Sequence, residues 1–71
     1  MDKSDTEETI NKLKNFGNGA SAHTANKCSY YIDVSFSQNK PKVTNKLIEL
    51  ANKAMTTNDW KELKDYMSKW W

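Results

Sequence analysis

The sequence predicts a small α+β domain with the element order helix, strand, helix, helix. Three observations predict this fold: a segment in which apolar and polar residues alternate, two later segments with apolar residues at helical spacing, and a length of 71 residues. A chain of this length has room for one hydrophobic core, which excludes a Rossmann unit or a barrel enzyme. We therefore expect a single domain over residues 1–71.

The first expected element is a helix over residues 5–16. Either Ser4 with Glu7 or Asp5 with Glu8 has the spacing of a capping box at its start. Three apolar residues follow at helical spacing, namely Ile10, Leu13 and Phe16. Because it offers so few apolar contacts, this helix is expected to cover the core rather than to form it.

The strictest pattern in the sequence predicts a strand over residues 28–37, after a small, polar loop over residues 17–27. The alternating sets are Cys28, Tyr30, Ile32, Val34 and Phe36 against Ser29, Tyr31, Asp33, Ser35 and Ser37. A period of two places the first set on a buried face and the second on a face open to solvent. The backbone N–H and C=O groups of this strand need a partner strand, and the sequence offers two candidates for it. Either residues 20–25 complete a hairpin, or the strand pairs with its copy in a homodimer.

Two amphipathic helices are expected in the C-terminal half, over residues 40–55 and 58–70. Asn39 is expected to cap the first of them, and Pro41 lies in its first turn, where the missing N–H costs no hydrogen bond. The polar residues 56–58 separate the two helices. Their apolar stripes are Val43, Leu47, Leu50, Ala51 and Ala54 in the first, and Trp60, Leu63, Met67 and Trp70 in the second.

No constellation of residues in the sequence points to catalysis, a cofactor or a bound metal. His23 and Cys28 are the only histidine and cysteine, whereas a zinc site takes about four ligands. The acidic residues lie at helix starts or among lysines, where they offer caps and helical ion pairs rather than an acid–base pair. We therefore expect a protein that is not an enzyme and that holds neither a cofactor nor a metal.

Charge and cysteine content predict a cytoplasmic protein without a membrane partner. All eleven basic residues are lysine, and the net charge of +2 does not by itself indicate nucleic acid. The first residues are acidic and polar, unlike a secretory signal, and no apolar run approaches the roughly 20 residues that span a membrane. A single cysteine cannot form an internal disulfide, which favours a reducing compartment.

The aromatic residues indicate a function by contact. Tryptophan and tyrosine are preferred anchors of protein interfaces, and the C-terminal aromatic stripe is wider than a small core requires. We therefore expect a regulatory or inhibitory protein that docks onto a macromolecular partner, in the first place a protein. The lysine-only, asparagine-rich composition is typical of AT-rich coding sequence and fits a bacterial or phage accessory protein. The expected partner-binding residues are Tyr31, Asp33, Tyr66, Trp70 and Trp71.

An alternative function rests on the strand–helix–helix order of residues 28–71, which resembles the ribbon–helix–helix DNA-binding proteins. In that family two copies pair their strands, and the solvent-facing strand side chains enter the major groove. The resemblance implies a dimeric transcriptional regulator, and Lys40, Lys42 and Lys46 are the expected phosphate contacts. The chain has no arginine for bidentate contacts to guanine, which favours the protein partner.

Overall fold

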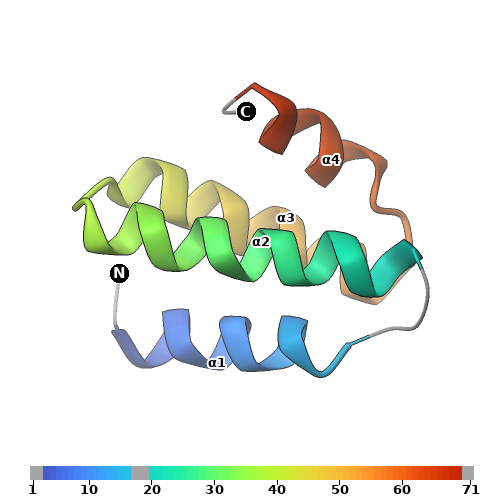
Figure 1. Ribbon diagram of the computed structural model, residues 1–71, viewed down its shortest axis with the longest axis horizontal. Helices are drawn as coiled ribbons and strands as arrows, with labels where there is room; N and C mark the ends of the chain where they lie inside the picture. Colours follow the sequence, from blue (N-terminus) through green and yellow to red (C-terminus); the bar gives the residue numbers. More distant parts are fainter. Residues whose placement is uncertain (1–2, 17–19, 70–71) are drawn as a thin grey trace.

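The computed structural model describes residues 3–16 and 20–69, which form four helices (Figure 1). They are α1 (Lys3–Lys14), α2 (Ala20–Ser37), α3 (Pro41–Thr57) and α4 (Lys61–Ser68). Helix α2 packs against both α1 and α3, and α1 also contacts α3. The short α4 packs on α3 and lies across from α1 (Figure 1). The described part of the chain is therefore a bundle of three helices with a fourth helix laid along one side.

The predicted α+β fold is wrong. Residues 28–37 form the second half of α2, and residues 20–25 form its first turns, so the described residues contain no strand. Both pairings of the expected strand, the hairpin and the strand-paired homodimer, are overturned with it. The predicted loop over residues 17–27 is also wrong from Ala20 onward, because the helix begins there.

Helix α2 is buried along two adjacent rows of side chains, which do not coincide with the alternating apolar residues. Side chains in both rows are at most 6% exposed, and they are Ala25, Ser29 and Ile32 in one row and Thr24, Cys28, Tyr31 and Ser35 in the other. Each set recurs every three or four residues, as one face of a helix requires. Three of these buried side chains are polar, namely Thr24, Ser29 and Ser35, whereas the apolar Tyr30 is 60% exposed. Apolar character therefore does not follow the buried face, and the helical period of the sequence is weak.

The three remaining helices were predicted, with shifted ends. Helix α1 begins before residue 5 and ends at Lys14, α3 extends through Thr57, and α4 is shorter than residues 58–70. Trp70, at the end of the predicted apolar stripe, lies outside the described residues. The rest of that stripe is confirmed, because Trp60, Leu63 and Met67 are all buried.

The turns around α3 follow from the conformational preferences of asparagine and proline. Pro41 occupies the first turn as predicted, but Lys40 rather than Asn39 is the N-cap, and no side chain caps the helix. Asn39 instead adopts a φ of 57°, in the left-handed region that asparagine tolerates. At the other end Asn58 has a φ of 61°, and its N–H donates to the carbonyl oxygen of Ala54 at 2.7 Å. The left-handed residue ends α3 and turns the chain toward α4.

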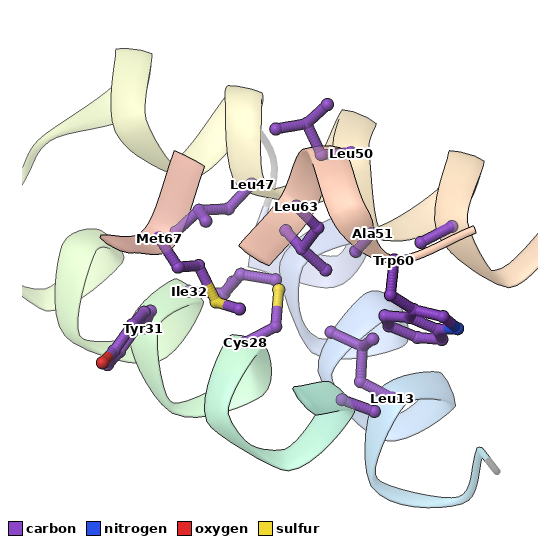
Figure 2. Close-up of a cluster of buried hydrophobic side chains, with 12 residues drawn as sticks. Leu13, Cys28, Tyr31, Ile32, Leu47, Leu50, Ala51, Trp60, Leu63 and Met67 are labelled. Atoms are coloured by element: carbon purple, nitrogen blue, oxygen red, sulfur yellow. The ribbon is translucent and has the colours of Figure 1, made fainter. Parts of the chain in front are cut away.

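All four helices and the Trp60 side chain contribute to the hydrophobic core (Figure 2). Leu13 comes from α1, Ile32 from α2 and Leu47 from α3, and each is at most 1% exposed. Leu63 and Met67 extend the core from α4. Burial of these side chains stabilises the bundle by roughly 1.5–3 kcal/mol for each large aliphatic group. The core therefore positions α4 on the surface that α2 and α3 form together.

A buried hydrogen bond joins α2 to α3 at the end of the bundle where the two helices are connected. The hydroxyl oxygens of Ser35 and Thr44 lie 2.7 Å apart. Each hydroxyl also has a main-chain acceptor, the carbonyl of Ile32 at 3.0 Å for Ser35 and the carbonyl of Lys40 at 3.1 Å for Thr44. One hydroxyl donates to the other, which in turn donates to its own carbonyl. The pair is therefore satisfied without water.

We expect Thr44→Val to lower the free energy of unfolding by about 1–3 kcal/mol, because the Ser35 hydroxyl loses a partner inside the protein. The double variant Ser35→Ala/Thr44→Val should cost less than the sum of the two single changes, since it leaves no hydroxyl unpaired. Urea denaturation of the four proteins measures both quantities. Strictly additive losses would show that the two hydroxyls do not interact.

Candidate functional site

A groove of about 390 Å³ lies between the C-terminal half of α2 and the N-terminal half of α3. Its volume falls within the range of about 300–1,000 Å³ that ligand pockets occupy. At its edge, Tyr30 is 60% exposed, the one exposed large hydrophobic side chain among the described residues. The side chains that line the groove are Tyr30, Tyr31, Val34, Ser35, Gln38, Lys40, Val43 and Leu47.

The groove exists because α4 is too short to cover the whole seam between α2 and α3. Helix α4 has 8 residues, against 18 in α2 and 17 in α3. At a rise of 1.5 Å per residue it spans about 12 Å, and its neighbours span about 27 and 26 Å. Figure 1 shows α4 ending partway along the two longer helices. Among residues 3–16 and 20–69, no other element covers the seam beyond its end.

Helical spacing places the apolar side chains on the two walls of the groove. Tyr30 and Val34 are one turn apart on α2, and Val43 and Leu47 are one turn apart on α3. Residues four apart lie on the same face of a helix, so each wall carries a ridge of two apolar side chains. The groove is therefore mainly apolar, with Gln38 and Lys40 as polar groups where α2 leads into α3.

The predicted position of Tyr31 on a solvent-facing surface is wrong, because its side chain is 4% exposed and belongs to the core. Its ring centroid lies 6.0 Å from that of Tyr30, and the ammonium of Lys27 lies 5.8 Å from the Tyr31 ring centroid. Tyr31 nevertheless lines the groove, so its role in binding a partner stays a prediction. The strand pattern assigned Tyr30 to the buried face, and the helix exposes it instead.

The structure does not bring the other expected partner-binding residues to the groove. Asp33 is exposed and lines a separate recess between α1 and α2, with Glu7 and Lys14. Tyr66 is half-buried and packs against the core from α4. The two remaining expected residues, Trp70 and Trp71, lie outside the described residues. Sequence reasoning missed Tyr30, Val34, Gln38 and Val43 as one surface. The spacing of four between the first three of them was the available signal.

The three lysines that were expected to contact DNA lie on or near the groove. Lys40 lines it, and Lys42 and Lys46 are exposed on α3. None of the three forms an ion pair within residues 3–16 and 20–69, whereas Lys53 further along α3 binds Glu62 of α4 at 3.0 Å. The ribbon geometry is overturned, because residues 28–37 are helical and supply no strand for a major groove.

Within residues 3–16 and 20–69, no three His, Cys, Asp or Glu side chains are grouped so that they could hold a metal ion. None of the helices described combines the length and the apolar character that crossing a bilayer requires. Comparisons with protein-family models, curated proteins and solved structures found no match.

Cys28 is fully buried at the centre of α2, where it behaves as a small apolar side chain. Burial raises the pKa of its thiol from 9.0 to about 12, because the thiolate is poorly solvated there. The neutral thiol is therefore the form that the folded state favours. Its contribution to stability is fully present below pH 9 and is lost as the pH rises toward 12.

We expect the Cys28 thiol to resist modification in the folded protein. A disulfide reagent such as Ellman's reagent should label it at neutral pH only as fast as the protein unfolds, and within seconds to minutes in concentrated urea. Replacement by alanine should remove the part of the stability loss above pH 9 that comes from this thiol. Rapid, complete labelling without denaturant would contradict its burial.

Proposed function

We propose that this chain is a non-catalytic regulatory or inhibitory binding protein that docks onto a protein partner through the groove between α2 and α3. The observation that carries the proposal is the exposed ring of Tyr30 at the edge of an apolar groove. A large aromatic side chain that is exposed to solvent gains no stabilisation from hydrophobic burial, and a bound partner would bury it. Tyrosine is also among the residues that most often dominate binding energy at protein interfaces.

The distribution of polar groups in the groove supports the same function. Protein interfaces combine an apolar centre with a polar rim. Here the apolar centre is made by Val34, Val43 and Leu47, and the polar groups Gln38 and Lys40 lie at one end. Ser35 is not available to a partner in the same way, because its hydroxyl is already bonded to Thr44.

Site-specific photo-crosslinking in the native host tests this proposal. A photoreactive amino acid at Gln38, which is exposed and lines the groove, should attach covalently to one partner protein. Tyr30→Ser should reduce the yield at least about tenfold, which corresponds to about 1.4 kcal/mol of binding energy. The control position is Asn52, which is exposed on α3 and does not line the groove.

The proposal fails if crosslinking from Asn52 recovers the same protein, or if Tyr30→Ser leaves the yield from Gln38 unchanged. The same assay with Tyr66→Ala and with Trp71→Ala tests whether the C-terminal aromatic residues, which stay a prediction, belong to the interface. A loss of yield from those variants, with Tyr30→Ser unaffected, would move the interface to that end of the chain.

A further inference from the structure

We infer that the segment of the partner that fills the groove is an amphipathic helix with acidic side chains, seated along the α2–α3 seam beyond the end of α4. This inference rests on the proposed function and specifies the chemistry of the partner. Two independent observations carry it, the continuity of the seam on which α4 already packs and the positive charge of Lys40 in the lining of the groove.

The seam between α2 and α3 is apolar where α4 covers it, and it continues to be apolar beyond the end of α4. Tyr31 and Leu47 belong both to the core that includes Met67 of α4 and to the lining of the groove. Figure 2 shows Met67 lying between Leu47 and Tyr31 in this view. The next apolar residues outward are Val34 on α2 and Val43 on α3, each about one turn further along.

A helix is the element that such a surface accepts. The walls of the groove are two helices, so their backbone groups are already hydrogen-bonded and offer no edge to an added strand. An amphipathic helix places apolar side chains at positions i, i+3, i+4 and i+7 into a groove of this kind. The occupant would therefore pack as α4 does, with its apolar stripe facing Val34 and Val43.

The charge around the groove selects an acidic occupant. Lys40, Lys42 and Lys46 lie at the connection between the two walls and on the first half of α3. The acidic residues nearest in sequence are Asp33, which lines the separate recess between α1 and α2, and Glu49. Among the described residues, Lys40 is the one charged residue that lines the groove, and none of their carboxylates pairs with it. Helix α3 also begins without a side-chain cap, so its positive end favours a carboxylate nearby. Complementary charge on a partner would set the direction and register of the bound helix.

Two synthetic peptides of about 16 residues, long enough to form helix, serve as the probe. Both carry leucine at the same i, i+3, i+4 and i+7 positions, and their remaining polar positions are mainly glutamate in one and mainly lysine in the other. Titration into the ¹⁵N-labelled full chain should show that the glutamate peptide shifts the amide signals of Val34, Gln38 and Val43. Lys40→Glu should weaken that binding at least tenfold and strengthen binding of the lysine peptide. The matched control Lys61→Glu, at an exposed position on α4, should leave both affinities unchanged.

The inference is overturned if the two peptides bind with equal affinity, if the amide signals of the groove do not shift, or if duplex DNA displaces the glutamate peptide. It is also overturned if the double variant Trp70→Ala/Trp71→Ala produces the same shifts of the groove signals without any peptide. That last result would show that the chain's own end occupies the groove. If Gln38 still crosslinks to a partner while both peptides fail, the proposed function stands and the acidic helix does not. If crosslinking and peptide binding both fail, the proposed function fails as well.

Discussion

Replacing Tyr31 with alanine is expected to lower the free energy of unfolding by about 3–5 kcal/mol, whereas the same change at Tyr30 should cost less than about 1 kcal/mol. The two residues are adjacent in sequence, but the helix buries Tyr31 to 4% exposure and leaves Tyr30 60% exposed. Removing the buried ring leaves a cavity in the core, and removing the exposed ring leaves none. A strand over residues 28–37 would reverse this order, because Tyr30 would then be the buried residue.

The expected loss at Tyr31 is large for a protein of this size. Native domains are stabilised by about 0.05–0.15 kcal/mol per residue, so a chain of 71 residues has about 4–11 kcal/mol in total. Because Tyr31→Ala would leave little folded protein, Tyr31→Phe is the second variant, and we expect it to retain most of the stability. Circular dichroism in a urea titration measures all three proteins. Equal losses at Tyr30 and Tyr31 would contradict the assignment of α2.

Trp60 is the second position where a large effect is expected, because it joins the ends of two helices. It precedes α4 as its N-cap residue and is 7% exposed. Its ring centroid lies 5.3 Å from that of Phe16, which follows α1. Trp60→Ala should therefore lower the free energy of unfolding by about 3–5 kcal/mol and loosen α4 from the bundle.

A double-mutant cycle separates the aromatic contact from the burial of Trp60. Phe16→Ala alone should cost less than Trp60→Ala, since Phe16 is only half-buried. The coupling between the two changes should be about 0.5–1.5 kcal/mol, the range for aromatic pairs. Lys61→Ala, at the exposed neighbour of Trp60, is the control and should be nearly neutral. A loss below 1 kcal/mol for Trp60→Ala, or no coupling, would contradict the packing of α4 shown here.

Sequence reasoning located α3 and α4 correctly because each helix has a single buried face. A single buried face places Leu47, Leu50 and Ala54 at helical spacing on α3, and Leu63 and Met67 on α4. Residues that typically begin or end helices gave further support for the position of α3. Pro41 starts α3 as proline does in a first helical turn, and a left-handed asparagine ends it. Patterns of this kind depend on local sequence alone.

Helix α2 could not be identified in the same way, because its conformation depends on the helices around it. Its buried residues include Thr24, Ala25 and Ser29, which are too small or too polar to be recognised as core from sequence. They are buried because α1 and α3 pack closely on both sides of α2. The tyrosines and β-branched residues of the segment favour strand only weakly, and packing overrides that preference.

The candidate site was only partly predictable for the same reason. Lys40 and Tyr31 were singled out from the sequence, and both line the groove. Tyr30 and Val34 were assigned to a buried sheet face, so their exposure on a helix was missed. The groove itself depends on the length of α4 relative to its neighbours, which no pattern in residues 58–70 reveals.

The backbone ¹³Cα chemical shifts of residues 28–37 test the central claim most directly, because the groove, the exposure of Tyr30 and the burial of Tyr31 all depend on α2. A continuous run of positive deviations from random-coil values over Ala20–Ser37, with sequential amide–amide contacts, is the expected result. Negative deviations over residues 28–37, accompanied by cross-strand contacts within the chain or between two copies, would contradict the helix and remove the groove with it.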